Sequence, residues 1–168
     1  MGYGLIHVLS NKMNFLDIGV LKLPSDDDHG SKLKKIFERT VEIIELHKPD
    51  ELAIEAPFFG KNVQSMLKLG RAQGVAIAAA LYKNIPIFEY SPKKIKLSIT
   101  GNGNSSKEQI AAMLHSLLKI DQEIKYLDAT DGLAAAVCHH FQSNSPIKTK
   151  TFSGWKSFLN ENPNKIAK

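Results

Sequence analysis

Three acidic residues have the spacing expected of a site that binds divalent metal ions. Glu55 directly follows the short apolar run at 52–54, and Asp128 and Asp131 stand three residues apart. A separation of three places two side chains on the same face of an α-helix. Mg²⁺ and Mn²⁺ prefer carboxylate oxygens, and two such ions about 4 Å apart can activate water and stabilise the leaving oxygen of a phosphodiester. These carboxylates favour metal-assisted phosphodiester hydrolysis, provided that they converge in space.

Each carboxylate also has an ordinary structural interpretation. Asp128 can be the N-cap of a helix, with Asp131 favoured in the first turn by the helix dipole. Glu55 can be a charge at the end of a strand that reaches water. The spacing alone does not choose between these roles and a metal site.

Aromatic and basic residues near these carboxylates could bind DNA. Phe58 and Phe59 follow Pro57 in an expected loop, where aromatic rings can stack on unpaired bases for about 1–3 kcal/mol per base. The alternative is that one ring packs inward. Lys107 is expected in the first turn of a helix, where its ammonium and the free backbone N–H groups can hold a phosphate. A simply solvated lysine is the alternative there.

The pattern of apolar residues predicts an α/β domain with a mixed sheet covered by helices. Ser31 is expected to cap the first helix and Ser105 the fourth, the latter in a capping box with Glu108. Ser91 and Pro92 are typical of a helix start. The expected elements are a hairpin over 2–9 and 14–23, a helix over 31–48, a strand over 52–54, a helix over 62–83, a strand over 85–90, a short helix from 91, and helices over 105–119 and 128–142.

Small residues and histidines receive structural interpretations. Gly70 and Gly74 each cost a helix about 1 kcal/mol, so we expect another element, either the sheet or a partner chain, to approach closely there. Cys138 is expected to be a small core residue. His139 and His140 are expected to be packing or surface residues, too far along their helix to share a metal with Asp128.

Composition limits the class of protein. The chain has 168 residues, 43% of them hydrophobic and 23% charged, which suits one compact domain. The net charge is +5, but residues 143–168 hold five lysines against one glutamate, so DNA attraction in the body must come from local patches. With one cysteine and no apparent membrane span or signal segment, we expect a cytoplasmic protein with no membrane partner.

Four runs of sequence, in order and with their spacing, together resemble the RuvC family of crossover junction endodeoxyribonucleases. The runs are AIEAPFFGKN at 53–62, LKLGRAQGVA at 67–76, FEY at 88–90 and DATDGLA at 128–134. The resemblance covers roughly residues 2–142. It implies a ribonuclease H-like fold and a homodimer that nicks four-way (Holliday) DNA junctions with Mg²⁺ or Mn²⁺, two ions per active site, alongside the RuvA and RuvB proteins.

The resemblance also implies roles for individual residues. Three of the family's four acidic ligands match Glu55, Asp128 and Asp131. The family's DNA-contacting residues match an aromatic residue in the loop and two lysines near the scissile phosphates, which are Phe58, Lys96 and Lys107.

The fourth ligand has no match within the chain. RuvC proteins open with a central strand ending in a Gly-Ile-Asp-Pro-Gly-like run, whereas this chain begins just after that place. We therefore expect residues 1–142 to be a nuclease domain that lacks its first strand, and 143–168 to be a basic tail. The natural chain is then expected to be longer, and residues 1–168 alone to bind junctions without cutting them. An actin-like or sugar-kinase ATPase is excluded, since it needs paired glycine-rich phosphate hairpins in two domains.

Overall fold

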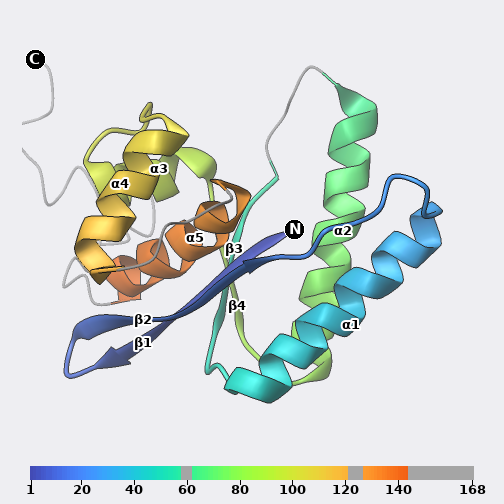
Figure 1. Ribbon diagram of the computed structural model, residues 1–168, viewed down its shortest axis with the longest axis horizontal. Helices are drawn as coiled ribbons and strands as arrows, with labels where there is room; N and C mark the ends of the chain where they lie inside the picture. Colours follow the sequence, from blue (N-terminus) through green and yellow to red (C-terminus); the bar gives the residue numbers. More distant parts are fainter. Residues whose placement is uncertain (58–61, 121–126, 144–168) are drawn as a thin grey trace, which may run out of the picture.

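The computed structural model describes residues 1–57, 62–120 and 127–143, and the order of its elements agrees with the sequence pattern. The elements are β1 (Gly2–Leu9), β2 (Lys12–Val20), α1 (His29–His47), β3 (Leu52–Glu55), α2 (Val63–Tyr82), β4 (Ile87–Tyr90), α3 (Pro92–Thr100), α4 (Lys107–Leu118) and α5 (Leu127–Ser143). In Figure 1, α1 and α2 lie together on one side of the strands, and α3, α4 and α5 gather on the other. Among the described residues, no helix is both long and apolar enough to cross a membrane.

The strands form two separate pairs. β1 and β2 are antiparallel, from Gly2 opposite Val20 to Leu9 opposite Lys12. β3 and β4 are parallel, and each pair forms its own two-stranded sheet. Antiparallel and parallel pairing are thus both present, as expected of a mixed sheet. Helix α5 packs on all four strands and therefore joins the two pairs.

Close contact between β1 and α5 depends on two glycines. A Cβ on Gly4 would lie 2.6 Å from the Cα of Leu133, and one on Gly132 would lie 2.7 Å from the Cα of Tyr3. Real Cβ atoms essentially never approach other atoms so closely, and only glycine allows backbone to lie against backbone here. Leu133 and Val137 are fully buried beneath this contact. These glycines fix where the first turns of α5 lie on the strands.

Two predicted helix caps are wrong by one to three residues. Helix α1 is capped by Asp28, whose Oδ1 accepts from the backbone N–H of Ser31 at 3.1 Å, so Ser31 lies inside the first turn. Helix α4 is capped by Ser106, which forms the capping box with Gln109. Ser105 is buried instead, and its hydroxyl bonds to other groups of the loop. In both cases neighbouring residues can cap equally well, and tertiary contacts choose between them.

Other boundaries and one packing expectation also differ. The second strand spans Lys12–Val20 rather than 14–23. The strand predicted over 85–90 begins at Ile87, because the N–H of Ile85 donates to the carbonyl of Ala80 in the turn after α2. No described atom outside α2's own backbone comes within 4 Å of a Cβ built on Gly70 or Gly74. The described part of this chain therefore does not supply the close neighbour expected there.

Candidate active site

Glu55 projects from the end of β3 onto the face covered by α5. It pairs with Tyr90 at the end of β4, and paired residues of neighbouring strands project to the same face. The hydroxyl of Tyr90 contacts His139 of α5, which identifies that face. The backbone carbonyl of Glu55 accepts a hydrogen bond of 2.8 Å from Nε2 of Gln73 on α2. The strand end that carries the carboxylate is thus held by a buried side chain.

The surroundings of Glu55 bring together four of the predicted site residues. Its pKa is raised above the usual value, first by burial and next by the negative charge of Asp131. The ammonium groups of Lys107 and Lys96 oppose this rise. A raised pKa from burial and a like charge is typical of functional carboxylates. The structure therefore places Glu55 within electrostatic reach of Asp131 and both predicted lysines.

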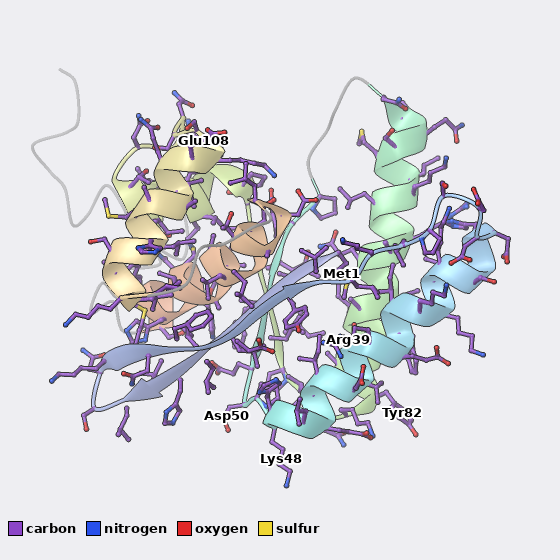
Figure 2. The ribbon with its side chains drawn as sticks, in the orientation of Figure 1. Met1, Arg39, Lys48, Asp50, Tyr82 and Glu108 are labelled. Carbon is purple, nitrogen blue, oxygen red and sulfur yellow. The ribbon has the colours of Figure 1, made fainter. Side chains whose placement is uncertain are left out.

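Asp128 and Asp131 lie in the first two turns of α5. The helix begins at Leu127, so Asp128 is already inside it and the N-cap interpretation is wrong. Lys107, the first residue of α4, lies beside both aspartates: its Nζ is 2.7 Å from Oδ2 of Asp131 and 3.7 Å from Oδ1 of Asp128. The pKa of Lys107 is raised, chiefly by its hydrogen bond to Asp131. Figure 2 labels the adjacent residue Glu108 at this end of α4.

Lys96 approaches the site from α3. Its Nζ donates to the backbone carbonyl of Ser105 at 2.8 Å, which ties α3 to the loop before α4. An ammonium group has three N–H donors, so this bond leaves two for other acceptors. Lys96 is thus both a structural link to the loop and a positive charge acting on Glu55.

The chemistry of these residues suits a hard cation, although they do not form a closed cage. Within residues 1–57, 62–120 and 127–143, no three His, Cys, Asp or Glu side chains form a group that could hold a metal ion. Between Asp128 and Asp131 the positive charge is supplied by Lys107 instead. Oxygen donors that already attract an ammonium fit Mg²⁺ or Mn²⁺ in ligand type. The three-carboxylate metal site stays a prediction.

Some of the predicted site residues lie outside the described part of the chain, and some contacts at the site were not predicted. Phe58, predicted to stack on a base, lies outside the described residues, as does the tail at 144–168. His139 was expected only to pack or to face solvent, yet its ring bonds to Tyr90 and Glu51 across the strands. The contact of Gln73 with the end of β3 was also missed. Glu51 lies just before β3 and four residues from Glu55, and this even spacing was the one signal in the sequence that both side chains face the same way.

Comparison with known proteins identifies the family. The family model described as crossover junction endodeoxyribonuclease RuvC matches residues 1–139. The chain belongs to the RuvC family. The curated RuvC of Christiangramia forsetii is 61% identical over 99% of this chain and 86% of its own length. That of Bacteroides fragilis is 55% identical over 99% of this chain and 89% of its own length.

Solved structures of the RuvC family confirm the predicted fold class. The RuvC structure of Thermus thermophilus superposes with a TM-score of 0.76, at 26% identity, over 84% of this chain and 87% of that one. The same protein in complex with a Holliday junction substrate gives a TM-score of 0.78 at the same identity and coverage. The helices and strands of this chain therefore have the ribonuclease H-like arrangement of RuvC proteins.

Proposed function

We propose that this protein is an endonuclease that resolves four-way (Holliday) DNA junctions by metal-dependent hydrolysis of phosphodiesters. The single observation that supports this most is the meeting of Glu55 with Asp131 and two lysines at one end of β3, in a chain of the RuvC family. A curated relative that is 61% identical carries the name of a crossover junction endodeoxyribonuclease. RuvA and RuvB are the proposed partners in junction processing.

The proposed ligands are Glu55, Asp128 and Asp131, and the proposed cofactor is Mg²⁺ or Mn²⁺, with two ions per site. When bound, the ions supply an activated water and charge stabilisation for the leaving oxygen. The carboxylates hold and orient them. Lys107 acts in two ways in this proposal. It balances the aspartates before binding, and once displaced from Asp131 its ammonium binds a non-bridging phosphate oxygen.

Lys96 and Phe58 complete the proposed DNA contacts. Lys96, like Lys107, lies close enough to Glu55 for its charge to act on that carboxylate. Its two remaining N–H donors suit a phosphate oxygen. Phe58 follows Ala56 and Pro57 immediately after β3 in the sequence, and the proposal gives it a base-stacking role at the junction.

The proposed active form is a homodimer built on α2. Val63, Leu67 and Leu81 are 63%, 51% and 58% exposed, and they share a 3–4 spacing with Gly70, Gly74 and Ala78. An apolar stripe with small residues at its centre lets a second helix approach closely. A two-fold dimer also presents two identical sites to a substrate that has two symmetric strands to cut.

A further strand is proposed to complete the sheet. The strands β1 and β3 belong to different two-stranded sheets, although both pack on α5. A strand paired between them would join the sheets and bring a fourth carboxylate to the end of β3. Residues 1–168 alone are then proposed to hold junctions without nicking them. The genomic sequence upstream of Met1 tests this: an in-frame stop codon before any aspartate-bearing strand contradicts it.

The function itself is tested with a synthetic four-way junction and Mg²⁺, using the full-length polypeptide. Glu55→Gln and Asp128→Asn are expected to abolish nicking while junction binding stays within about twofold. Glu89→Gln is the matched control, because Glu89 is exposed on β4 and projects to the opposite face from Tyr90. Nicking retained in either active-site variant contradicts the metal assignment. Binding without nicking by the unaltered full-length protein favours a non-catalytic junction-binding module.

A further inference from the structure

Two pairs of residues relate α5 to β3, one pair of like charge and one bonded. At one end the negative charge of Asp131 acts on Glu55, and at the other Nε2 of His139 lies 2.6 Å from Oε2 of Glu51, the residue before β3. Glu51 and Glu55 are four residues apart, about 13 Å in an extended chain, and Asp131 and His139 are eight apart on a helix, about 12 Å. The two segments therefore run in opposite directions, with matching lengths between the two pairs.

The pair at the far end is part of a set of hydrogen bonds around the buried ring of His139, with Tyr90 inside and the half-exposed Glu51 at the edge. His139 is 9% exposed, and its ring stacks on Phe88 with centroids 4.4 Å apart. A carboxylate only accepts, so Nε2 of His139 carries the proton that is donated to Glu51. Nδ1 forms a second hydrogen bond, of 2.7 Å, with the hydroxyl of Tyr90. One imidazole thus binds a residue at the start of β3 and a residue at the end of β4.

Directional hydrogen bonds matter here because the side chains of α5 packed around His139 are small and apolar. Around His139, α5 buries Ala134, Ala135 and Val137, which are small apolar side chains. Apolar contacts have no preferred direction, so they resist sliding or rotation of a helix less than hydrogen bonds do. The hydrogen bonds of His139 therefore add a directional contact with the β3–β4 pair, whereas the close approach at Gly4 and Gly132 positions the first turns of α5 on β1.

Because α5 is rigid, the position of His139 also sets the position of Asp128 near the start of the same helix. Asp128 and His139 are eleven residues apart, close to three full turns, and therefore lie on nearly the same face of α5. Any rotation that broke the bonds to Glu51 and Tyr90 would swing Asp128 by the same angle. In Figure 2, Asp50, which precedes Glu51, lies at the opposite end of the molecule from Glu108, which marks the active-site end of α4.

We propose that His139 is a positioning residue that sets the register of α5 on β3 and so fixes the spacing of Asp128 and Asp131 from Glu55. Glu51 and Tyr90 act with it by holding the two ring nitrogens. This inference rests on the proposed metal-dependent function. His139 itself need not touch metal or DNA, because its effect is carried by the rigid helix between it and the aspartates.

The test measures Mn²⁺ binding to the full-length protein by the loss of the free-ion electron paramagnetic resonance signal. His139→Phe keeps the ring and removes both hydrogen bonds, and it is expected to weaken Mn²⁺ binding by about tenfold, at the lower end of the effect of orienting residues. The expected loss of nicking is in kcat, with the KM for the junction unchanged. His140→Phe is the matched control, since His140 is equally buried at the next position of the same helix, while the ring bonded to Glu51 and Tyr90 is that of His139.

Single-bond variants keep the test decisive if His139→Phe does not fold. Tyr90→Phe and Glu51→Ala each remove one hydrogen bond and are expected to weaken Mn²⁺ binding by about threefold. Glu51→Gln keeps an acceptor for Nε2 and should restore wild-type affinity. Wild-type Mn²⁺ affinity in these variants overturns the positioning role alone. If the unaltered protein binds no Mn²⁺ at all, the proposed function fails and this inference fails with it.

Discussion

Nζ of Lys107 donates a hydrogen bond of 2.7 Å to Oδ2 of Asp131 and lies 3.7 Å from Oδ1 of Asp128. The single positive charge of the first residue of α4 therefore offsets part of the negative charge of the two aspartates in the first turns of α5. An ammonium at this place competes with any cation that the aspartates bind, because both require the same oxygens. The same lysine is available to a phosphate once the aspartates have another partner. Lys107 thus links the charge balance of the metal-free site to the binding of DNA.

This competition predicts opposite effects of one substitution on two measurements. Lys107→Met is expected to strengthen Mn²⁺ binding by a few fold, because it removes the competing charge. It should also lower the rate of junction nicking by at least tenfold, because the phosphate contact is lost. Metal titration and a single-turnover nicking assay on the same preparation measure both effects. Lys12→Met, at the exposed start of β2, should change neither, and weaker metal binding in Lys107→Met would contradict the competition.

The raised pKa of Glu55 predicts a pH-dependent cost to the metal-free fold. Burial and Asp131 favour the protonated form in the folded state, so the carboxylate destabilises the fold as pH rises from its ordinary pKa through the raised one. Glu55→Gln should therefore be more stable than wild type at pH 7 in a chelator, and equal to it well below the ordinary pKa of glutamate. Urea unfolding at the two pH values measures this. If Glu55→Gln were less stable than wild type at pH 7, the ionised Glu55 carboxylate would not destabilise the metal-free fold.

The bond from Gln73 to the carbonyl of Glu55 predicts a stability loss close to the site. Gln73→Leu leaves that carbonyl without its side-chain partner, and we expect a loss of about 1–3 kcal/mol in the free energy of unfolding. Nicking should fall as well, because the end of β3 carries the carboxylate. Gln64→Leu is the control on the exposed part of the same helix. Equal stabilities of the two variants would mean that the bond contributes nothing.

The exposed apolar stripe of α2 predicts a homodimer that a single substitution in the stripe should convert to a monomer. A Cβ at Gly74 meets no described atom within 4 Å outside the backbone of α2, and Gly74→Arg replaces glycine with a better helix former, so the monomer fold should persist. Sedimentation analysis is expected to show a dimer for the unaltered protein and a monomer for this variant. Ser65→Arg, half a turn away around the same helix, should remain dimeric. A dimer that survives Gly74→Arg would place the interface elsewhere.

The helices and strands were predicted well because they depend on apolar periodicity within short stretches of sequence. Individual side-chain contacts were predicted poorly because they depend on residues that are far apart in the sequence. Helix caps shifted where adjacent residues offered equivalent acceptors, as Ser105 and Ser106 do. The sequence pattern put Glu55 at a strand end and Asp131 near a helix start, and the charge of Asp131 acts on Glu55, while their shared role as metal ligands stays a prediction. The bond between His139 and Glu51 could not be predicted, because it depends on how far α5 is displaced along β3, and packing of the whole domain sets that distance.

Glu55, Asp128 and Asp131 are proposed to bind divalent cations at the place where the ammonium of Lys107 lies beside the two aspartates. The sharpest test of this metal site is a crystal structure of the full-length protein soaked in Mn²⁺, with anomalous scattering measured near the manganese edge. We expect anomalous peaks in coordination contact with Asp131 and Glu55, with the ammonium of Lys107 displaced from Asp131. Manganese bound elsewhere, with the bond between Lys107 and Asp131 intact at saturating metal, would contradict it.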